Sequence, residues 1–215
     1  MKKNIKLKLN AVILVCIAII TFGCDLKPQE KFEFDPATTP QVTFGAMTPW
    51  EWIQTNPKNE FNFLIEAIKL TDLQEEYSNT TDKRTYFLLK DFGWRNFNGI
   101  KRREFGNPNI SLADVDPVKL RKILLYYIVP TYVDQGPGHL LTLDANYTFE
   151  TLSTDPLNQI MTLSRDWNYT IGINNSPVLP ATKFSANVKL HNYIFSNGNS
   201  VAHLLENHVR LAPFE

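Results

Sequence analysis

Cysteine is scarce in this chain, which has only Cys16 and Cys24 among its 215 residues. Both lie near the amino terminus, so a disulfide framework through the rest of the chain is excluded. A chain of this length can bury enough apolar surface for one ordinary domain. Its core alone must therefore hold that domain together.

The sequence also lacks the motifs of the common catalytic and metal sites. It has no Gly-x-Ser-x-Gly elbow, no Cys–His arrangement and no Gly-rich phosphate loop. Carboxylate pairs such as Asp114 and Asp116 lie at an expected helix start. His203 and His208 are five residues apart. This spacing does not put them on the same face of a strand or of a helix, as a shared metal site would need. We therefore expect no catalytic activity and no bound metal.

No excess of one charge sign exists either, because 22 basic residues balance 22 acidic ones. A nucleic-acid-binding protein needs a basic surface, so that class is excluded. The densest basic cluster, Lys101-Arg102-Arg103, is followed at once by Glu104. We interpret this cluster as a solvated loop.

What is present begins with a lysine-rich start and an apolar run from Ala11 to Phe22, too short to span a bilayer. The run closes with Gly23-Cys24, which resembles the lipobox of bacterial lipoproteins. The resemblance implies that residues 1–23 are a signal peptide, that Cys24 is acylated and that the mature chain is anchored to a membrane. Removing residues 1–23 takes away four lysines and no acid, which leaves a net charge of −4.

Residues 24–45 carry Pro, Thr and charge without hydrophobic periodicity, so we interpret them as a flexible, lipid-anchored tether before a domain at residues 46–215. Helices are expected from Thr48, which begins a capping box, and after Asn59, with an apolar stripe. A third is expected from Asp116 until Pro130. Residues 92–106 look like an irregular excursion. Expected strands cover residues 84–89, 147–152, 160–163, 169–173, 187–195 and 203–211.

Helices come first and strands last in this order of elements, which predicts an α+β fold. Four stretches then resemble the characteristic segments of a fasciclin-like domain. They are Thr48-Pro49-Trp50-Glu51-Trp52-Ile53 with residues 61–73, Thr85-Tyr86-Phe87-Leu88-Leu89-Lys90-Asp91, Leu124-Leu125-Tyr126-Tyr127-Ile128-Val129-Pro130, and Asn199-Ser200-Val201-Ala202-His203-Leu204-Leu205-Glu206 with residues 209–213.

This resemblance implies a wedge with a β-sandwich-like core and flanking helices, no cofactor and no intrinsic catalysis. It assigns structural roles to Tyr126, Tyr127, Asn199 and His203, with His203 expected to fix local backbone through hydrogen bonds. Tyr127 stands where the family usually has the His of a Tyr-His pair. The adhesion motif of some animal members therefore does not carry over.

Short lipoproteins of this kind resemble accessory surface proteins of SusC/SusD-type transporters. The expected partner is then a TonB-dependent transporter with its lipoprotein, and the expected location is the outer membrane of the cell envelope. Asp25 after Cys24 marks inner-membrane retention in some bacteria, so the inner membrane stays open.

Aromatic residues are abundant, with 14 Phe, 8 Tyr and 4 Trp. Trp167, beside Arg165, falls in an expected hairpin tip, and Trp94 and Tyr132 are further candidate contact residues. Trp and Arg are favoured interface anchors, which predicts contact with a protein partner. Exposed aromatic rings can also stack on sugars, so a surface glycan-binding lipoprotein and a general adhesin stay open as alternatives.

Overall fold

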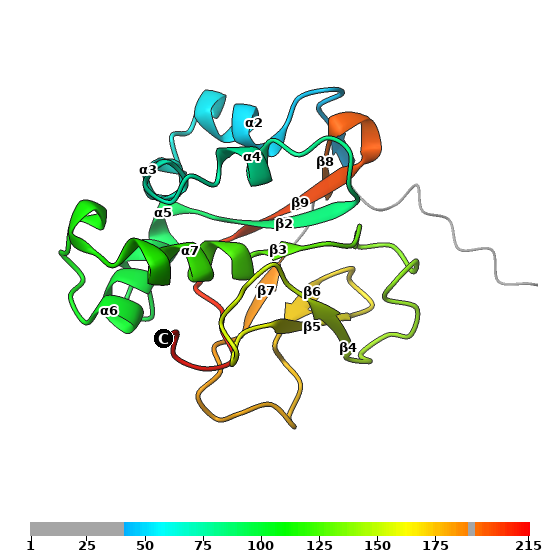
Figure 1. Ribbon diagram of the computed structural model, residues 1–215. Helices are drawn as coiled ribbons and strands as arrows, with labels where there is room; N and C mark the ends of the chain where they lie inside the picture. The colour runs from blue at the N-terminus through cyan, green and yellow to red at the C-terminus, as the bar shows by residue number, and fades with distance from the viewer. Residues whose placement is uncertain (1–40, 189–191) are drawn as a thin grey trace, which may run out of the picture. The chain divides into compact units, whose positions relative to one another are not determined.

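The computed structural model describes residues 41–188 and 192–215 (Figure 1). The expected signal peptide, Cys24 and residues 24–40 of the expected tether lie outside the described residues. The described part combines short helices with two sheets, as the α+β prediction requires. The helices are α2 (Pro49–Thr55), α3 (Asn62–Leu70), α4 (Gln74–Tyr77), α5 (Asp91–Arg95), α6 (Ile100–Phe105) and α7 (Pro117–Tyr126).

The first sheet has the strand order β1-β8-β9-β2-β3. Its centre is the parallel pair of β2 (Arg84–Leu89) and β9 (Ser200–Leu205), in register from Arg84 opposite Ser200 to Leu89 opposite Leu205. Every residue of β2 is buried, as expected for a central strand covered on both faces. The flanking strands are β1 (Gln41–Thr43), β8 (Asn192–Phe195) and β3 (Ile128–Val129).

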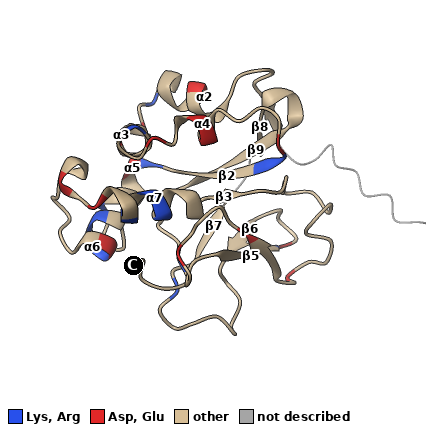
Figure 2. Ribbon diagram, viewed as in Figure 1, with Lys and Arg blue, Asp and Glu red and all other residues tan. Residues whose placement is uncertain are grey.

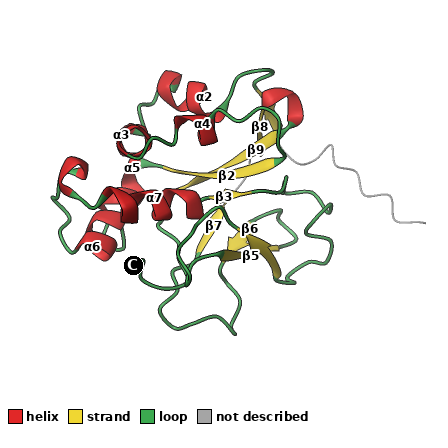
Figure 3. Cartoon of the chain, in the orientation of Figure 1, coloured by secondary structure: helices red, strands yellow, loops and turns green. Residues whose placement is uncertain are grey.

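The second sheet is an antiparallel meander in the order β4-β5-β6-β7. Its strands are β4 (Tyr147–Glu150), β5 (Ile160–Arg165), β6 (Ile171–Ile173) and β7 (Ala186–Val188). Figure 3 shows α2, α3 and α4 on one side of the first sheet and the second sheet on the other side. The hydrophobic core fills the space between these layers.

Two helix starts form as the sequence predicts. Thr48 accepts a hydrogen bond from the Glu51 amide, and the Glu51 carboxylate accepts one from the Thr48 amide, so the capping box is complete. Asp116 caps α7, with Pro117 in its first turn. The expected cap at Asn59 was wrong, because Asn59 has a left-handed φ of 51° and α3 begins three residues later.

Four other local predictions were wrong. The interpretation of residues up to 45 as tether fails at Gln41–Thr43, which pairs in parallel with β8. Residues 92–106 are not irregular, because most of them form α5 and α6. The last strand covers Ser200–Leu205, several residues earlier than expected. The expected strand at 187–195 divides between β7 and β8, which belong to different sheets, and residues 189–191 lie outside the described part.

Candidate binding surfaces

The motif residues make side-chain hydrogen bonds to other parts of the chain. His203 is buried, and its Nε2 lies 2.9 Å from the carbonyl oxygen of Val133, to which it donates a hydrogen bond. The Tyr126 hydroxyl accepts a hydrogen bond from the side-chain amide of Asn174 (2.8 Å), and Asn199 donates one to Thr80 O (2.8 Å). Each of these side chains thus fixes a distant segment of the chain.

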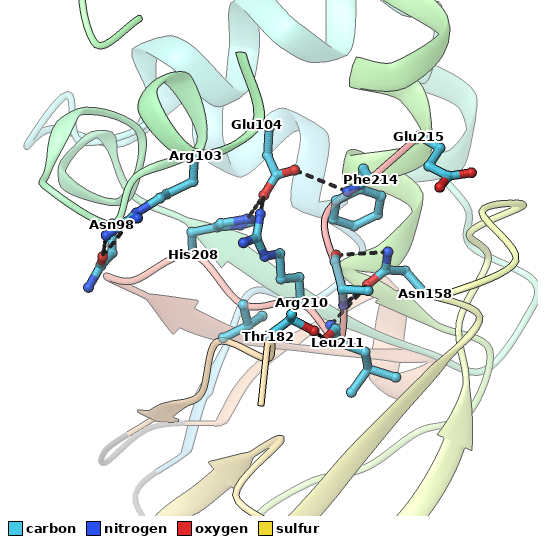
Figure 4. Close-up of polar contacts among 12 residues, drawn as sticks. Asn98, Arg103, Glu104, Asn158, Thr182, His208, Arg210, Leu211, Phe214 and Glu215 are labelled. Atoms are coloured by element: carbon cyan, nitrogen blue, oxygen red, sulfur yellow. Dashed lines mark hydrogen bonds and ion pairs between the residues drawn. The ribbon is translucent and has the colours of Figure 1, made fainter. Parts of the chain in front are cut away.

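Tyr127 belongs to a buried polar cluster near the carboxyl terminus. Figure 4 shows three other members of this cluster, Glu104, His208 and Arg210. Its hydroxyl lies 2.6 Å from Nδ1 of His208, and Nε2 of His208 lies 2.8 Å from Oε1 of Glu104. Glu104 also pairs with Arg210 and accepts a hydrogen bond from the Phe214 amide (3.1 Å). The cluster therefore joins α6 and α7 to the segment that follows β9.

Burial and charge set the protonation states in this cluster. Burial raises the pKa of Tyr127 well above its ordinary value, so its hydroxyl keeps the proton and donates a hydrogen bond to Nδ1 of His208. Burial also lowers the pKa of His208, against the opposing effect of Glu104, and favours the neutral ring. Burial opposes ionisation of Glu104, but hydrogen bonding and charge from His208, with the charge of Arg210, outweigh it and lower the pKa of that carboxyl.

The order Tyr127–His208–Glu104 resembles the hydrogen-bond chain of a catalytic triad. All three side chains are buried, however, so no substrate can reach the hydroxyl. The cluster instead fixes the backbone directly after β9. Sequence analysis missed it because Glu104 was interpreted with its basic neighbours as a solvated loop. The nearest sequence signal was an acid inside a basic run.

The hairpin tip between β5 and β6 is the most exposed aromatic surface among the sequence-predicted sites. Trp167 has 74% of its surface exposed. The Asp166 carboxylate accepts hydrogen bonds from the amides of Asn168 (2.9 Å) and Thr170 (2.8 Å), so the turn is held by its own side chain. The aromatic ring therefore projects from an ordered tip.

Two exposed leucines lie at the same end of the second sheet as Trp167. The Arg165 guanidinium donates to the carbonyls of Leu140 (3.1 Å) and Leu141 (3.4 Å), and the Asp144 amide donates to Arg165 O (2.8 Å). These bonds hold the 140–144 segment against the base of the hairpin. Leu141 and Leu143 are both exposed there. We call Leu141, Leu143 and Trp167 the hairpin-tip surface.

Two of the predicted contact residues were wrong. Trp94 has 0% exposure, because the short helix α5 turns it into the core. Arg165 is 5% exposed, since its guanidinium is used on the 140–144 segment and lies over the Tyr169 ring. Tyr132 is half-buried, with the Lys83 ammonium 5.7 Å from its ring centre, and lies in the segment after β3.

A groove that sequence analysis missed lies at the carboxyl ends of β2 and β9. Because these strands are parallel and in register, Lys90 and Glu206 leave the sheet side by side. The Lys90 ammonium lies 3.3 Å from Glu206 and 3.6 Å from Glu60, which comes from the segment between α2 and α3. The groove has a volume of about 690 Å³, within the range of about 300–1,000 Å³ for small-ligand sites.

The apolar side of this groove comes from Trp52 on α2, Tyr193 on β8 and Leu204 on β9. The Trp52 and Tyr193 rings have centres 5.4 Å apart and planes inclined at 40°. Trp52 also packs against Phe61 and Phe195, so the core supports its position. No local sequence pattern predicts this site, because α2 is far from β8 and β9 in the sequence and meets them only in the folded chain.

Comparison with known proteins identifies the fold. The structure is similar to that of a FAS1 domain pair from the insect cell adhesion molecule Fasciclin I, with a TM-score of 0.53 and 14% sequence identity. The match covers 76% of this chain and 51% of that one, so the chain spans about half the length of its neighbour. The predicted α+β, fasciclin-like fold is therefore confirmed. No protein-family model and no curated protein matches the sequence.

Among residues 41–188 and 192–215, none of the helices has the length and apolar character needed to cross a membrane.

Proposed function

We propose that this chain is a non-enzymatic interaction module of the cell envelope, which binds another envelope protein through the hairpin-tip surface. The observation that carries the proposal is the 74% exposure of Trp167 on an ordered turn, at the same end of the second sheet as two exposed leucines. Contiguous exposed apolar side chains mark interaction sites, and a rigid Trp is a frequent anchor of such sites. Binding would bury all three.

The charge distribution supports an apolar contact at this end. Lysines and arginines gather on α6 and α7, as Figure 2 shows. The strands of the second sheet carry only Glu150 and Arg165 as charged residues, and Arg165 is buried. Fasciclin I, whose domain pair has a similar fold, is a cell adhesion molecule, and an interaction role is consistent with that likeness.

We further propose that acylated Cys24 anchors the chain to the outer membrane and that its partner is a TonB-dependent transporter of the SusC/SusD type. The lipobox-like Gly23-Cys24 and the resemblance to accessory lipoproteins support this reading. Asp25 leaves the inner membrane as the competing location. A partner in the same membrane would meet the hairpin-tip surface at high effective concentration, which favours a modest contact area.

Native co-purification tests the proposal. The full-length tagged chain is extracted from its own membranes in mild detergent, and the co-eluting proteins are identified and quantified. We expect a TonB-dependent transporter in stoichiometric amount, and we expect Trp167→Ala to reduce it strongly. Val178→Ala is the matched control, because Val178 is 90% exposed in a different loop. Wild-type protein that elutes alone contradicts the proposal, as does equal recovery from both variants.

A further inference from the structure

We infer that the groove between the α2–α3 segment and the carboxyl ends of β2 and β9 is a binding site for an uncharged oligosaccharide. This site is separate from the hairpin-tip surface and does not depend on the protein contact proposed above. Three features of the groove support the inference: its aromatic side, its polar groups and its charge balance.

The aromatic side is suited to stacking against a sugar ring. The C–H groups on one face of a pyranose carry partial positive charge, and the face of an aromatic ring is negative. Trp52 and Tyr193 are both half-buried and line the groove. Since their planes are inclined at 40°, one flat sugar ring can stack on only one of them. The other ring then forms a side wall.

The polar groups of the groove are those that bind hydroxyls. Three side-chain amides line it together with two carboxylates and two ammonium groups: Asn56, Asn187, Asn207, Glu60, Glu206, Lys58 and Lys90. Amides and carboxylates supply acceptors, and amides and ammonium groups supply donors, so neighbouring hydroxyls of a sugar can both donate and accept. The Lys90 ammonium bridges Glu60 and Glu206, which fixes these groups before a ligand arrives.

The charge balance selects against charged ligands. The two lysines and two glutamates of the lining sum to zero, so no excess of either sign attracts a phosphate, a uronic acid or a cationic peptide. A purely apolar ligand would leave the desolvated polar groups of the rim without partners. An uncharged, hydroxyl-rich ligand satisfies both conditions.

Tyr193 is the residue that links the two halves of the groove. It lines the groove together with Lys90 and Glu60. Partial burial raises the pKa of its hydroxyl, an effect that Lys90 opposes and Glu60 adds to. The Tyr193 ring also meets Trp52. A sugar stacked on Tyr193 would therefore place its hydroxyls beside Lys90 and Glu60.

The groove is also held firmly on the side of β9. His208 follows Asn207 directly in the chain. Through its contact with Glu104, which also pairs with Arg210, it fixes the backbone there. Asn207 in turn accepts a hydrogen bond from the Asn96 side chain (3.3 Å). A site that is ordered before binding loses less conformational entropy when the ligand binds.

Titration calorimetry of the full-length chain in detergent tests the inference. The probes are soluble malto-, cello-, xylo- and fructo-oligosaccharides. We expect at least one of them to bind, with Tyr193→Ala raising Kd about tenfold or more and Tyr193→Phe retaining most of the affinity. Val178→Ala is the matched control and should bind the same sugar as tightly as wild type, since Val178 is exposed in a loop outside both surfaces.

Salt dependence and folding controls complete the test. Binding of an uncharged sugar should stay within about twofold between low salt and about 1 M salt, where ionic contacts are screened. Circular dichroism and thermal unfolding establish that Tyr193→Ala is folded, and Glu206→Gln supplies a second, exposed variant that should also weaken binding. No binding of any probe overturns the inference, as does a Kd unchanged by both variants or a steep loss of affinity with salt.

Discussion

Thr85 and His203 bind the two backbone groups of one residue. Thr85 Oγ1 accepts a hydrogen bond from the Val133 amide (2.8 Å), and His203 Nε2 donates one to the Val133 carbonyl (2.9 Å). Thr85 also donates to Thr131 O (2.6 Å). Two motif residues on the paired strands β2 and β9 therefore hold the same segment, the one that leaves β3. These bonds join segments that are more than a hundred residues apart in the sequence.

Thr85→Val should destabilise the fold by about 1–3 kcal/mol, because it keeps the shape but leaves the buried Val133 amide without its acceptor. Urea unfolding followed by circular dichroism measures the loss. Thr148→Val is the matched control, since Thr148 lies exposed on β4, and it should change stability by less than about 0.5 kcal/mol. Equal stability of the two variants would show that the bond to Val133 contributes little.

Tyr127→Phe should destabilise the fold by a similar amount, about 1–3 kcal/mol, because His208 Nδ1 and the Val209 amide both lose a hydrogen-bond partner in the core. Tyr132→Phe is the control, since the Tyr132 ring is only half-buried. The two variants are compared by chemical unfolding at neutral pH. If Tyr127→Phe is as stable as the control, the cluster does not hold the segment after β9.

Acid should destabilise the protein in two stages. The folded pKa of His208 is lowered, so the unfolded chain binds this proton first, and stability falls as pH drops below about 6.5. The folded pKa of Glu104 is also lowered, so its contribution is complete above about pH 4.3 and is lost as pH falls further, through the folded pKa. Unfolding free energies measured across this range give both slopes.

His208→Gln isolates the first stage. This variant removes the titrating ring but leaves an amide, so it should be less stable at neutral pH and show a smaller slope between about pH 7 and about pH 5. His139→Gln is the control, because His139 is exposed, and it should keep the wild-type slope. Parallel profiles for wild type and His208→Gln would assign the acid sensitivity to other groups.

The two tryptophans weighed as contact residues should differ sharply in stability. Trp94→Ala empties a buried site and should cost about 3–5 kcal/mol, whereas Trp167→Ala removes an exposed ring and should stay within about 0.5 kcal/mol. Thermal and urea unfolding of both variants test this. A large loss for Trp167→Ala would mean that its ring supports the fold instead of a contact.

Elements with strong local signals could be predicted from the sequence. The capping box at Thr48, the Asp116-Pro117 start of α7 and the continuous apolar run of β2 each carry their own chemistry within a few residues. The hairpin position of Trp167 followed from a polar turn between two extended runs. These features depend on contacts between near neighbours in the chain, which a sequence displays directly.

Features that depend on distant segments could not be predicted in this way. β1 has three exposed residues and forms through backbone pairing with β8, so it leaves no alternating pattern. Helix α5 has five residues, too few to show which face buries Trp94. Glu104 is buried only because His208 and Arg210, a hundred residues later, return to it. The groove likewise appears only after the strands are ordered.

The most direct test of the interaction role is site-specific photo-crosslinking in living cells. A photoreactive phenylalanine analogue is placed at position 167, with position 178 as the exposed control on another loop. We predict one abundant adduct at position 167, in which mass spectrometry identifies a TonB-dependent transporter, and no such adduct at position 178. Absence of an adduct at position 167, or the same adducts from both positions, would contradict the proposal that this tip binds a specific partner.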